Sequence, residues 1–172
     1  MSAARQTASA IVSRYGGIYE HSPWVAEITA SQLVGLDDID RIADIMADCV
    51  DNASDERRLA LIRAHPELAG RTKISGTLTK DSSDEQSSAG LDYCSADEYE
   101  KFHSFNNAYR EKFGFPFVMA VRDSSRAEIL AAFEHRLGND QAAEFEMALS
   151  EIHKIARLRL RAMDASAPLN SP

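Results

Sequence analysis

The sequence predicts an all-α fold: a single-domain helical bundle with one short extended apolar segment. Apolar residues recur at three- and four-residue spacings along most of the chain, and only residues 117–121 are strand-like. The 172 residues, 44% of them hydrophobic, suit one domain with a self-sufficient core. We expect that domain to cover residues 1–172, with an ordered core at about residues 8–163 and a flexible tail at residues 164–172.

Two helical signals lie in the first third of the chain. Ser22 followed by Pro23 is typical of a helix start, with the serine as the cap and the proline at the first helical position. Behind Asp37 or Asp38, a three- and four-residue apolar period predicts an amphipathic helix. The residues that carry this period are Ile39, Ile42, Ile45, Met46, Cys49 and Val50.

A shorter helix is expected next, with Leu59 and Ile62 on its apolar face. It should end near His65, because the residue before a proline, here Pro66, is biased away from helical backbone. Residues 70–79 carry no period, which predicts a loop.

A Ser-x-x-Glu pattern occurs three times in the second half of the chain. It is typical of a capping box, in which the serine and glutamate side chains satisfy opposite backbone N–H groups. The pairs are Ser82 with Glu85, Ser95 with Glu98, and Ser125 with Glu128. The second pattern predicts a helix that ends at Gly114, and the third predicts a helix up to Leu137, just before Gly138. A long final helix is expected over about residues 139–163.

The composition argues against several classes of protein. Lys plus Arg total 19 and Asp plus Glu total 27, and the net charge of −8 disfavours binding to nucleic acid or to an anionic membrane. No stretch approaches the ~18 apolar residues of a membrane span, and residues 1–10 lack the apolar core of a signal peptide. Cys49 and Cys94 are too few for a disulfide framework, and the chain does not end in Ser-Lys-Leu. We therefore expect a cytoplasmic protein.

Signatures of cofactor, phosphate and nucleophile sites are absent from the sequence, including G-x-G-x-x-G, the P-loop, G-x-S-x-G and H-E-x-x-H. The histidines show no zinc-ligand spacing with the cysteines, so we expect no metal. These histidines are His21, His65, His103, His135 and His153. Any chemistry must therefore come from ordinary side chains acting on a reactive substrate, without a cofactor.

One charged side chain is expected on the apolar face of the final helix. At about 100° per residue, Arg159 falls in the middle of the apolar arc, whereas Arg157 and Arg161 fall on the opposite, polar face. A guanidinium in that position needs an anion, because an unpaired buried charge is strongly penalised. Two partners remain open: a carboxylate of the protein itself, which helix geometry alone favours, or an anionic ligand, which the planar five-donor fork suits.

Three further residues have both a structural and a functional interpretation. His65 at a helix end can titrate near neutrality and transfer protons, but a histidine there also caps the last carbonyls of its helix. Ser82 and Glu85 are explained by a capping box alone, or they form a polar ligand site at a helix N-terminus.

Five short motifs follow one another between residues 15 and 160, and they cover most of the chain. They are Tyr19-Glu20-His21-Ser22-Pro23-Trp24, His65-Pro66-Glu67-Leu68-Ala69-Gly70, Ser82-x-x-Glu85-Gln86-x-x-Ala89-Gly90-Leu91, Asn106-x-x-Tyr109-x-x-Lys112-Phe113-Gly114-Phe115-Pro116-Phe117-Val118 and Glu151-Ile152-x-Lys154-Ile155-Ala156-x-Leu158-Arg159-Leu160. Together they resemble the 2-oxo-4-hydroxy-4-carboxy-5-ureidoimidazoline (OHCU) decarboxylases of urate degradation. Each motif alone is weakly specific, and five in the family order are highly specific.

The resemblance implies that His65 is the catalytic acid–base residue and that Glu85 is its partner. It also implies substrate contacts, those of residues 117–121 largely through main-chain groups. The implied substrate-binding residues are Pro66, Ser82, Ser83, Asp84, Glu85, Gln86, Phe117, Val118, Met119, Ala120, Val121 and Arg159. One position departs from the family pattern, since Glu67 stands where aspartate is common.

The activity that the resemblance implies is that of a carboxy-lyase, which removes CO₂ from OHCU to yield (S)-allantoin. Such a reaction needs no cofactor or metal, because the ring C=N bond beside the departing carboxylate accepts the electron pair. The resemblance further implies a homodimer with OHCU and allantoin as its small-molecule partners, and no nucleic acid or membrane. Two alternatives remain: a non-catalytic helical module that holds a small anionic ligand through Arg159, and a structural protein in which Arg159 pairs internally.

Overall fold

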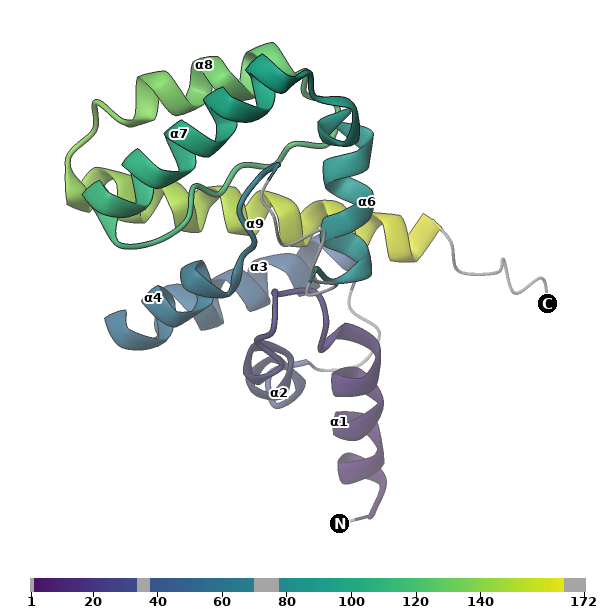
Figure 1. The fold of residues 1–172 in the computed structure, drawn as a ribbon. Helices are drawn as coiled ribbons and strands as arrows, with labels where there is room; N and C mark the ends of the chain where they lie inside the picture. The colour runs from purple at the N-terminus through teal and green to yellow at the C-terminus, as the bar shows by residue number, and fades with distance from the viewer. Residues whose placement is uncertain (1, 34–37, 70–77, 166–172) are drawn as a thin grey trace. The chain divides into compact units, whose positions relative to one another are not determined.

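The structure of the protein, a computed structural model, describes residues 2–33, 38–69 and 78–165. Within these ranges the secondary structure is helical, with no strand, so the predicted all-α class is confirmed (Figure 1). The elements are α1 (Ser2–Tyr15), α2 (Trp24–Ala30), α3 (Ile39–Asp51), α4 (Asp55–Ala64), α6 (Lys80–Ser88), the 3-10 turn η1 (Leu91–Tyr93), α7 (Ala96–Phe113), α8 (Arg126–Arg136) and α9 (Gln141–Ala165). Over the same ranges, no helix is long and apolar enough to cross a membrane.

Some expectations concern residues outside the described ranges. They are the alternative helix cap at Asp37, most of the loop expected at residues 70–79, and the end of the tail expected at residues 164–172. The final helix extends to Ala165, slightly beyond the end expected for it.

The chain divides into two compact units, and each is described by itself. The first unit comprises Met1–Leu61 with His153–Pro172, and the second comprises Ile62–Ile152. The division falls within α4 and within α9, so each of these helices contributes residues to both units.

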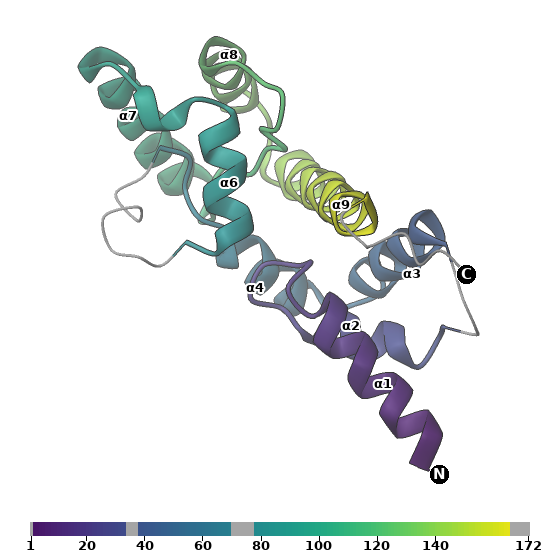
Figure 2. The same cartoon turned by 90° about the vertical axis from the view of Figure 1, so that its right-hand side faces the viewer.

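In the first unit, α1 packs on α2 and α2 packs on α3. The last part of α9 lies beside α3 (Figure 2). The two helices run antiparallel, because successive α9 residues pair with ever earlier α3 residues. The pairs are His153 with Asp51, Arg157 with Asp44, and Arg161 with Asp40. Helix α3 buries the predicted apolar face, and Asp38 caps it by accepting a hydrogen bond from the Arg41 backbone N–H at 2.8 Å.

In the second unit, α7 and α8 lie side by side and run in the same direction (Figure 1). Arg126 at the start of α8 pairs with Glu98 near the start of α7, while Lys112 near the end of α7 donates to the Leu137 carbonyl beyond α8. Parallel neighbours need a connection that returns along their length. The chain between α7 and α8, which contains residues 117–121, makes this return with no regular secondary structure.

An aromatic cluster surrounds the returning chain. The Phe117 ring stacks on Phe133 of α8 with ring centroids 3.7 Å apart, and Tyr109 of α7 meets Phe117 edge-on at 5.3 Å. Aromatic pairs of this kind add ~0.5–1.5 kcal/mol beyond the burial of their area. The sequence therefore correctly predicted one extended apolar segment packed against helices, although it forms no strand.

The structure corrects two predicted helix starts. Helix α2 begins at Trp24 with Pro23 as its cap and no side-chain cap bond, so Ser22 is not the cap. Helix α6 begins before Ser82, because the Thr79 hydroxyl caps it by accepting the Ser82 backbone N–H at 3.3 Å. The other two Ser-x-x-Glu patterns are complete capping boxes, as predicted.

Two elements of the structure were not predicted from the sequence. They are α1 and the single short turn η1. Gly114 ends α7 with φ +74°, the left-handed conformation that glycine adopts without steric cost.

Candidate active site

His65 is the first residue after α4 and is buried, with 7% of its surface exposed. The helix ends there because Pro66 follows, and the His65 backbone N–H closes the last turn on the Ile62 carbonyl at 3.2 Å. His65 therefore places a buried imidazole at the junction between a helix and a loop.

Gln86 of α6 ties its helix to the chain that follows His65. Its amide nitrogen donates to the Glu67 carbonyl, and its amide oxygen accepts the Ala69 backbone N–H, both at 3.2 Å. Ala69 has φ +50°, a left-handed conformation that costs a non-glycine residue energy, so the hydrogen bond from Gln86 helps to hold it. Glu85, the predicted acidic partner, precedes Gln86 on α6. The two bonds of Gln86 therefore attach the helix that carries Glu85 to the segment that follows His65, the predicted catalytic residue.

Helix α7 contacts the same segment after His65. Asn106, which is buried, donates from its side-chain amide to the Leu68 carbonyl at 2.9 Å. Arg110 pairs with Glu67 at 2.7 Å, so the glutamate that departs from the family pattern still has a cationic partner. Side chains of α6 and α7 therefore hold this short loop on two sides.

The predicted α6 residues differ in their surroundings. Ser82 is buried, Ser83 and Glu85 are half-buried, and Asp84 is exposed and pairs with Lys80 at 2.6 Å. These residues stand on one short helix in the second unit, together with Gln86. Their contacts with a substrate remain predictions.

Residues 117–121, called the 117–121 segment below, are held through their main chain. Arg136 of α8 donates from Nη1 to the Val118 carbonyl at 2.7 Å, and Glu151 of α9 accepts the Ala120 backbone N–H at 2.9 Å. The side chains of Phe117, Val118 and Val121 are buried. Two main-chain polar atoms of this segment, the Val118 carbonyl and the Ala120 N–H, are thus bonded to charged side chains of α8 and α9.

A buried ion pair accounts for the position of Arg136. The guanidinium pairs with Glu144 of α9 at 2.5 Å and lies over the Phe117 ring, 4.3 Å from its centroid. Glu144, which is 0% exposed, also accepts hydrogen bonds from the Tyr109 hydroxyl and the Asn139 amide. Burial, followed by the hydrogen bond to Glu144, raises the pKa of Tyr109 well above its ordinary value, so this hydroxyl remains a neutral donor.

Arg159 lies in the first unit and is buried, with 4% of its surface exposed. Its Nη1 donates to Glu20 Oε2 at 2.9 Å and to the Ile18 carbonyl at 3.2 Å. The predicted burial of this guanidinium is confirmed, as is the position of Arg157 and Arg161 on the polar face. The protein itself supplies one anionic partner, and the contact of Arg159 with a ligand remains a prediction.

Two buried glutamates, Glu144 and Glu151, were not assigned a role from the sequence, although Glu151 begins the last of the five motifs. Both occupy the row of α9 that carries Arg159, since 144, 148, 151, 155 and 159 follow one another at spacings of three and four. The signal that singled out Arg159, a charge on an apolar face, therefore also marks these two glutamates. Glu20, the partner of Arg159, could not be found this way because it lies outside a long helix.

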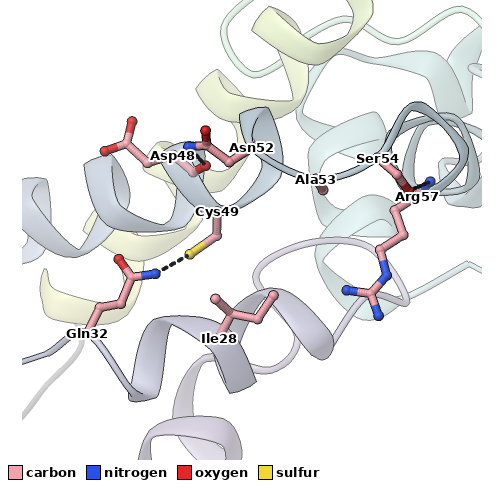
Figure 3. Close-up of a pocket in the computed structure, with 8 residues that line it drawn as sticks. All are labelled: Ile28, Gln32, Asp48, Cys49, Asn52, Ala53, Ser54 and Arg57. Atoms are coloured by element: carbon pink, nitrogen blue, oxygen red, sulfur yellow. Dashed lines mark hydrogen bonds between the residues drawn. The ribbon is translucent and has the colours of Figure 1, made fainter.

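A cavity of about 460 Å³ lies in the first unit, between α2, α3 and the start of α4 (Figure 3). It is lined by Ile28, Gln32, Asp48, Cys49, Asn52, Ala53, Ser54 and Arg57. Its polar groups largely bond to one another: Gln32 donates to the Cys49 sulfur at 3.5 Å, and Asn52 donates to the Asp48 carbonyl at 2.8 Å. None of the predicted site residues lines this cavity, which contains no histidine.

The described part of the chain contains no group of three or more His, Cys, Asp or Glu side chains that could hold a metal ion. The hydrogen-bonding groups around the 117–121 segment and the loop after His65 are N–H donors of the main chain, amides and guanidinium groups, and the oxygen acceptors of carbonyls, amides and carboxylates. This chemistry suits a polar organic ligand with several hydrogen-bonding edges.

Comparison with known proteins identifies the family. Residues 4–161 match the family described as OHCU decarboxylase. The chain belongs to the OHCU decarboxylase family. Within it, the chain is 47% identical over 149 residues to a Haloferax volcanii protein named 2-oxo-4-hydroxy-4-carboxy-5-ureidoimidazoline decarboxylase, covering 87% of this chain and 86% of that protein. A Halalkalicoccus jeotgali protein of the same name is 45% identical over 149 residues, covering 87% and 82% of the two chains.

A solved structure extends this family likeness to the fold. The chain is similar to the crystal structure of an (S)-allantoin synthase, with a TM-score of 0.72 and 34% sequence identity. The alignment covers 92% of this chain and 51% of that chain, so this protein matches about half of the solved structure.

Proposed function

We propose that this protein decarboxylates OHCU to (S)-allantoin in urate degradation. The match to the OHCU decarboxylase family over residues 4–161 supports this activity. The observation that supports a specific site for this activity is the pair of hydrogen bonds made by the Gln86 amide. They attach the helix that carries Glu85 to the loop that begins at His65. That arrangement offers an acid–base side chain and a carboxylate on elements that are bonded to each other.

The substrate needs an enzyme mainly to position it and to move protons. Its name places a carboxyl and a hydroxyl group on one ring carbon and a ureido group on the next. When the bond to the carboxylate breaks, CO₂ leaves and the electron pair enters the ring C=N bond, whose nitrogen takes up a proton. The hydroxyl then loses its proton as the carbon that bears the ureido group gains one, and this last transfer decides the handedness of allantoin.

In this proposal His65 transfers protons and Glu85 orients the substrate, and also His65, through hydrogen bonds. Main-chain groups of the 117–121 segment and the side chains around α6 hold the ring and ureido edges. Arg159 binds the anionic group while it keeps its bond to Glu20, since a guanidinium has five N–H donors. The full proposed set is His65, Pro66, Ser82, Ser83, Asp84, Glu85, Gln86, Phe117, Val118, Met119, Ala120, Val121 and Arg159.

The decisive experiment follows the optical activity of the product. Because OHCU can lose CO₂ unaided, its disappearance alone does not show catalysis, and free protonation from either face yields racemic allantoin. We expect the purified protein, supplied with freshly generated OHCU, to yield an excess of (S)-allantoin by circular dichroism. Racemic product from the folded protein would overturn the assignment.

We also propose that the protein is a cytoplasmic homodimer and that its two units form one domain. These statements rest on the resemblance to the family and on the composition of the chain. Light scattering on the purified protein tests the dimer, and a single cooperative thermal transition in calorimetry supports one domain.

A further inference from the structure

We propose that Glu151 and Arg136 are positioning residues, which hold the main chain of the 117–121 segment in the shape that binds substrate. This inference rests on the proposed function, because it gives that segment its task. Neither side chain is proposed to touch the substrate. Their role is to fix the direction of the peptide groups that do.

The first step is the bond from the Ala120 N–H to Glu151. Glu151 is 8% exposed, and its Oε2 accepts this N–H at 2.9 Å from a residue 31 positions away in sequence. A charge-assisted hydrogen bond to a partly desolvated carboxylate is stronger than a bond between neutral groups. It fixes the plane of the peptide that joins Met119 to Ala120, the two half-buried residues of the segment.

The second step is the bond from Arg136 to the Val118 carbonyl. The guanidinium uses Nη1 for this carbonyl and Nε for Glu144, at 2.7 Å in each case. Glu144 is in turn held by Tyr109 and Asn139, so Arg136 cannot rotate away without breaking a buried ion pair. Val118 and Ala120 are therefore anchored from α8 and α9, on either side of Met119.

The third step concerns why such anchors are needed. The 117–121 segment belongs to neither a helix nor a sheet, so no regular ladder of hydrogen bonds sets its peptide directions. The position of a substrate that binds main-chain groups of this segment then depends on the two hydrogen bonds from Arg136 and to Glu151. A misplacement of 1 Å at a site of this kind can cost about 10²-fold in rate.

The test compares Glu151→Ala and Glu151→Gln in the full chain. Glutamine keeps an oxygen that can accept the Ala120 N–H, whereas alanine removes it. Glu128→Ala is the matched control, because Glu128 also accepts a backbone N–H, that of Ser125, but does so in an exposed capping box of α8. Glu151→Asp shortens the side chain and so moves the carboxylate away from the Ala120 N–H while keeping its charge. This variant replaces Glu151→Ala if the alanine variant does not fold.

We expect Glu151→Ala to lower kcat/KM for OHCU by about 10²-fold and to reduce the excess of (S)-allantoin. Glu151→Gln should restore both towards wild type, and Glu128→Ala should change neither. Amide hydrogen exchange of Ala120, measured without substrate, should speed up in Glu151→Ala alone. A merely structural role would lower the thermal midpoint without moving the handedness of the product.

The outcomes separate this inference from the proposed function. Racemic allantoin from the wild-type protein rejects the decarboxylase assignment, and with it the catalytic part of this inference. If the wild-type protein is stereoselective and the Glu151→Ala variant is equally stereoselective and active, this inference is rejected while the decarboxylase assignment stands. A Glu151→Gln variant as impaired as Glu151→Ala also rejects it, because charge rather than the hydrogen bond would then be what matters.

Discussion

His65 combines three properties that a proton-transferring residue needs. It is buried, it stands where α4 ends, and the loop that follows it is hydrogen-bonded to Gln86 and Asn106. A buried side chain beside an anchored loop loses little conformational freedom when a substrate binds. Its position also makes it replaceable without harm to the helix, since α4 ends at Ala64.

His65→Asn should lower the rate of OHCU decarboxylation by about 10²–10⁴-fold, because a placed acid–base group contributes that much. Asparagine is tolerated at helix ends, so helicity by circular dichroism should stay unchanged. His135→Asn, at an exposed position in the last turn of α8, is the control and should be fully active. Normal turnover by His65→Asn would remove this residue from the mechanism.

Arg159 is expected to serve two anions, Glu20 and the substrate. In Arg159→Lys the ammonium can still pair with Glu20, but the planar fork is lost. The KM for OHCU, the anionic substrate, should rise by about tenfold or more, since a charge-assisted hydrogen bond contributes ~1.5–3 kcal/mol. The thermal midpoint should fall little.

Arg161→Lys is the matched control for Arg159, because Arg161 stands on the exposed face of the same helix and pairs with Asp40. We expect it to be nearly silent in both measurements. A large loss of thermal stability in Arg159→Lys, with the KM for OHCU unchanged, would show that Arg159 serves only the internal ion pair.

At the scale of elements, helix starts depend on side-chain caps that the sequence makes visible. Ser95 accepts the Glu98 backbone N–H at 3.2 Å, while Glu98 accepts the Ser95 N–H at 2.9 Å. The same Glu98 pairs with Arg126, so the start of α7 is joined to the start of α8. The pKa of Glu98 is lowered first by the Ser95 backbone bond and then by Arg126.

Ser95→Ala should reduce the free energy of unfolding by ~1 kcal/mol, the usual cost of losing a serine cap. Urea denaturation measures this change. Ser150→Ala, at an exposed position inside α9, should be neutral or slightly stabilising, because alanine is the better helix former there. Equal stability of the two variants would contradict the role of this cap.

The charges between α3 and α9 make a pH-dependent contribution. The pKa of Asp40 is held below its ordinary value by hydrogen bonds from Arg161 and then Arg157. A carboxyl group with a depressed pKa in the folded state stabilises the protein above its unfolded pKa, and this contribution is lost as the pH falls through its folded pKa.

Asp40→Asn should therefore lower the thermal midpoint at about pH 7, and the difference from wild type should shrink as the solution is acidified below the ordinary carboxyl range. Asp84→Asn, which removes an exposed pair within one helix turn, is the control. A difference that stays constant with pH would show that the Asp40 charge is not the cause.

For the whole molecule, the net charge of −8 sets a constraint on an enzyme with an anionic substrate. The average field repels such a substrate, so cationic groups must act locally. Arg159 and Arg136 are buried guanidinium groups, each paired with a glutamate. Pairing allows them to remain in the interior, where an isolated charge would be prohibitively costly.

After exhaustive treatment of the protein with a chelator, the reaction should still yield an excess of (S)-allantoin. The physical reason is that the ring C=N bond of the substrate accepts the electron pair, so catalysis needs no metal. Circular dichroism of the product, before and after chelation, measures this. Activity that disappears with chelator and returns with added metal would reveal a metal site.

Periodicity and cap chemistry in the sequence determined the helical class, the ends of α7 and most of α9, because both depend on residues a few positions apart. The same local rules placed Arg159 on an apolar face and singled out His65 before its proline. They failed at α6, where Ser82 and Thr79 both offer a hydroxyl and only the folded backbone selects Thr79 as the cap.

Only the tertiary structure decided which distant groups meet. Gln86 reaches Glu67 and Ala69, and Glu151 reaches Ala120, across separations for which no local pattern exists. The sequence marked Arg159 as a charge in need of an anion, but the choice of Glu20 depended on the packing of α9 against the chain near Ile18. Local order follows from neighbouring residues, whereas the partner of a buried polar group is decided by the packing of the chain around it.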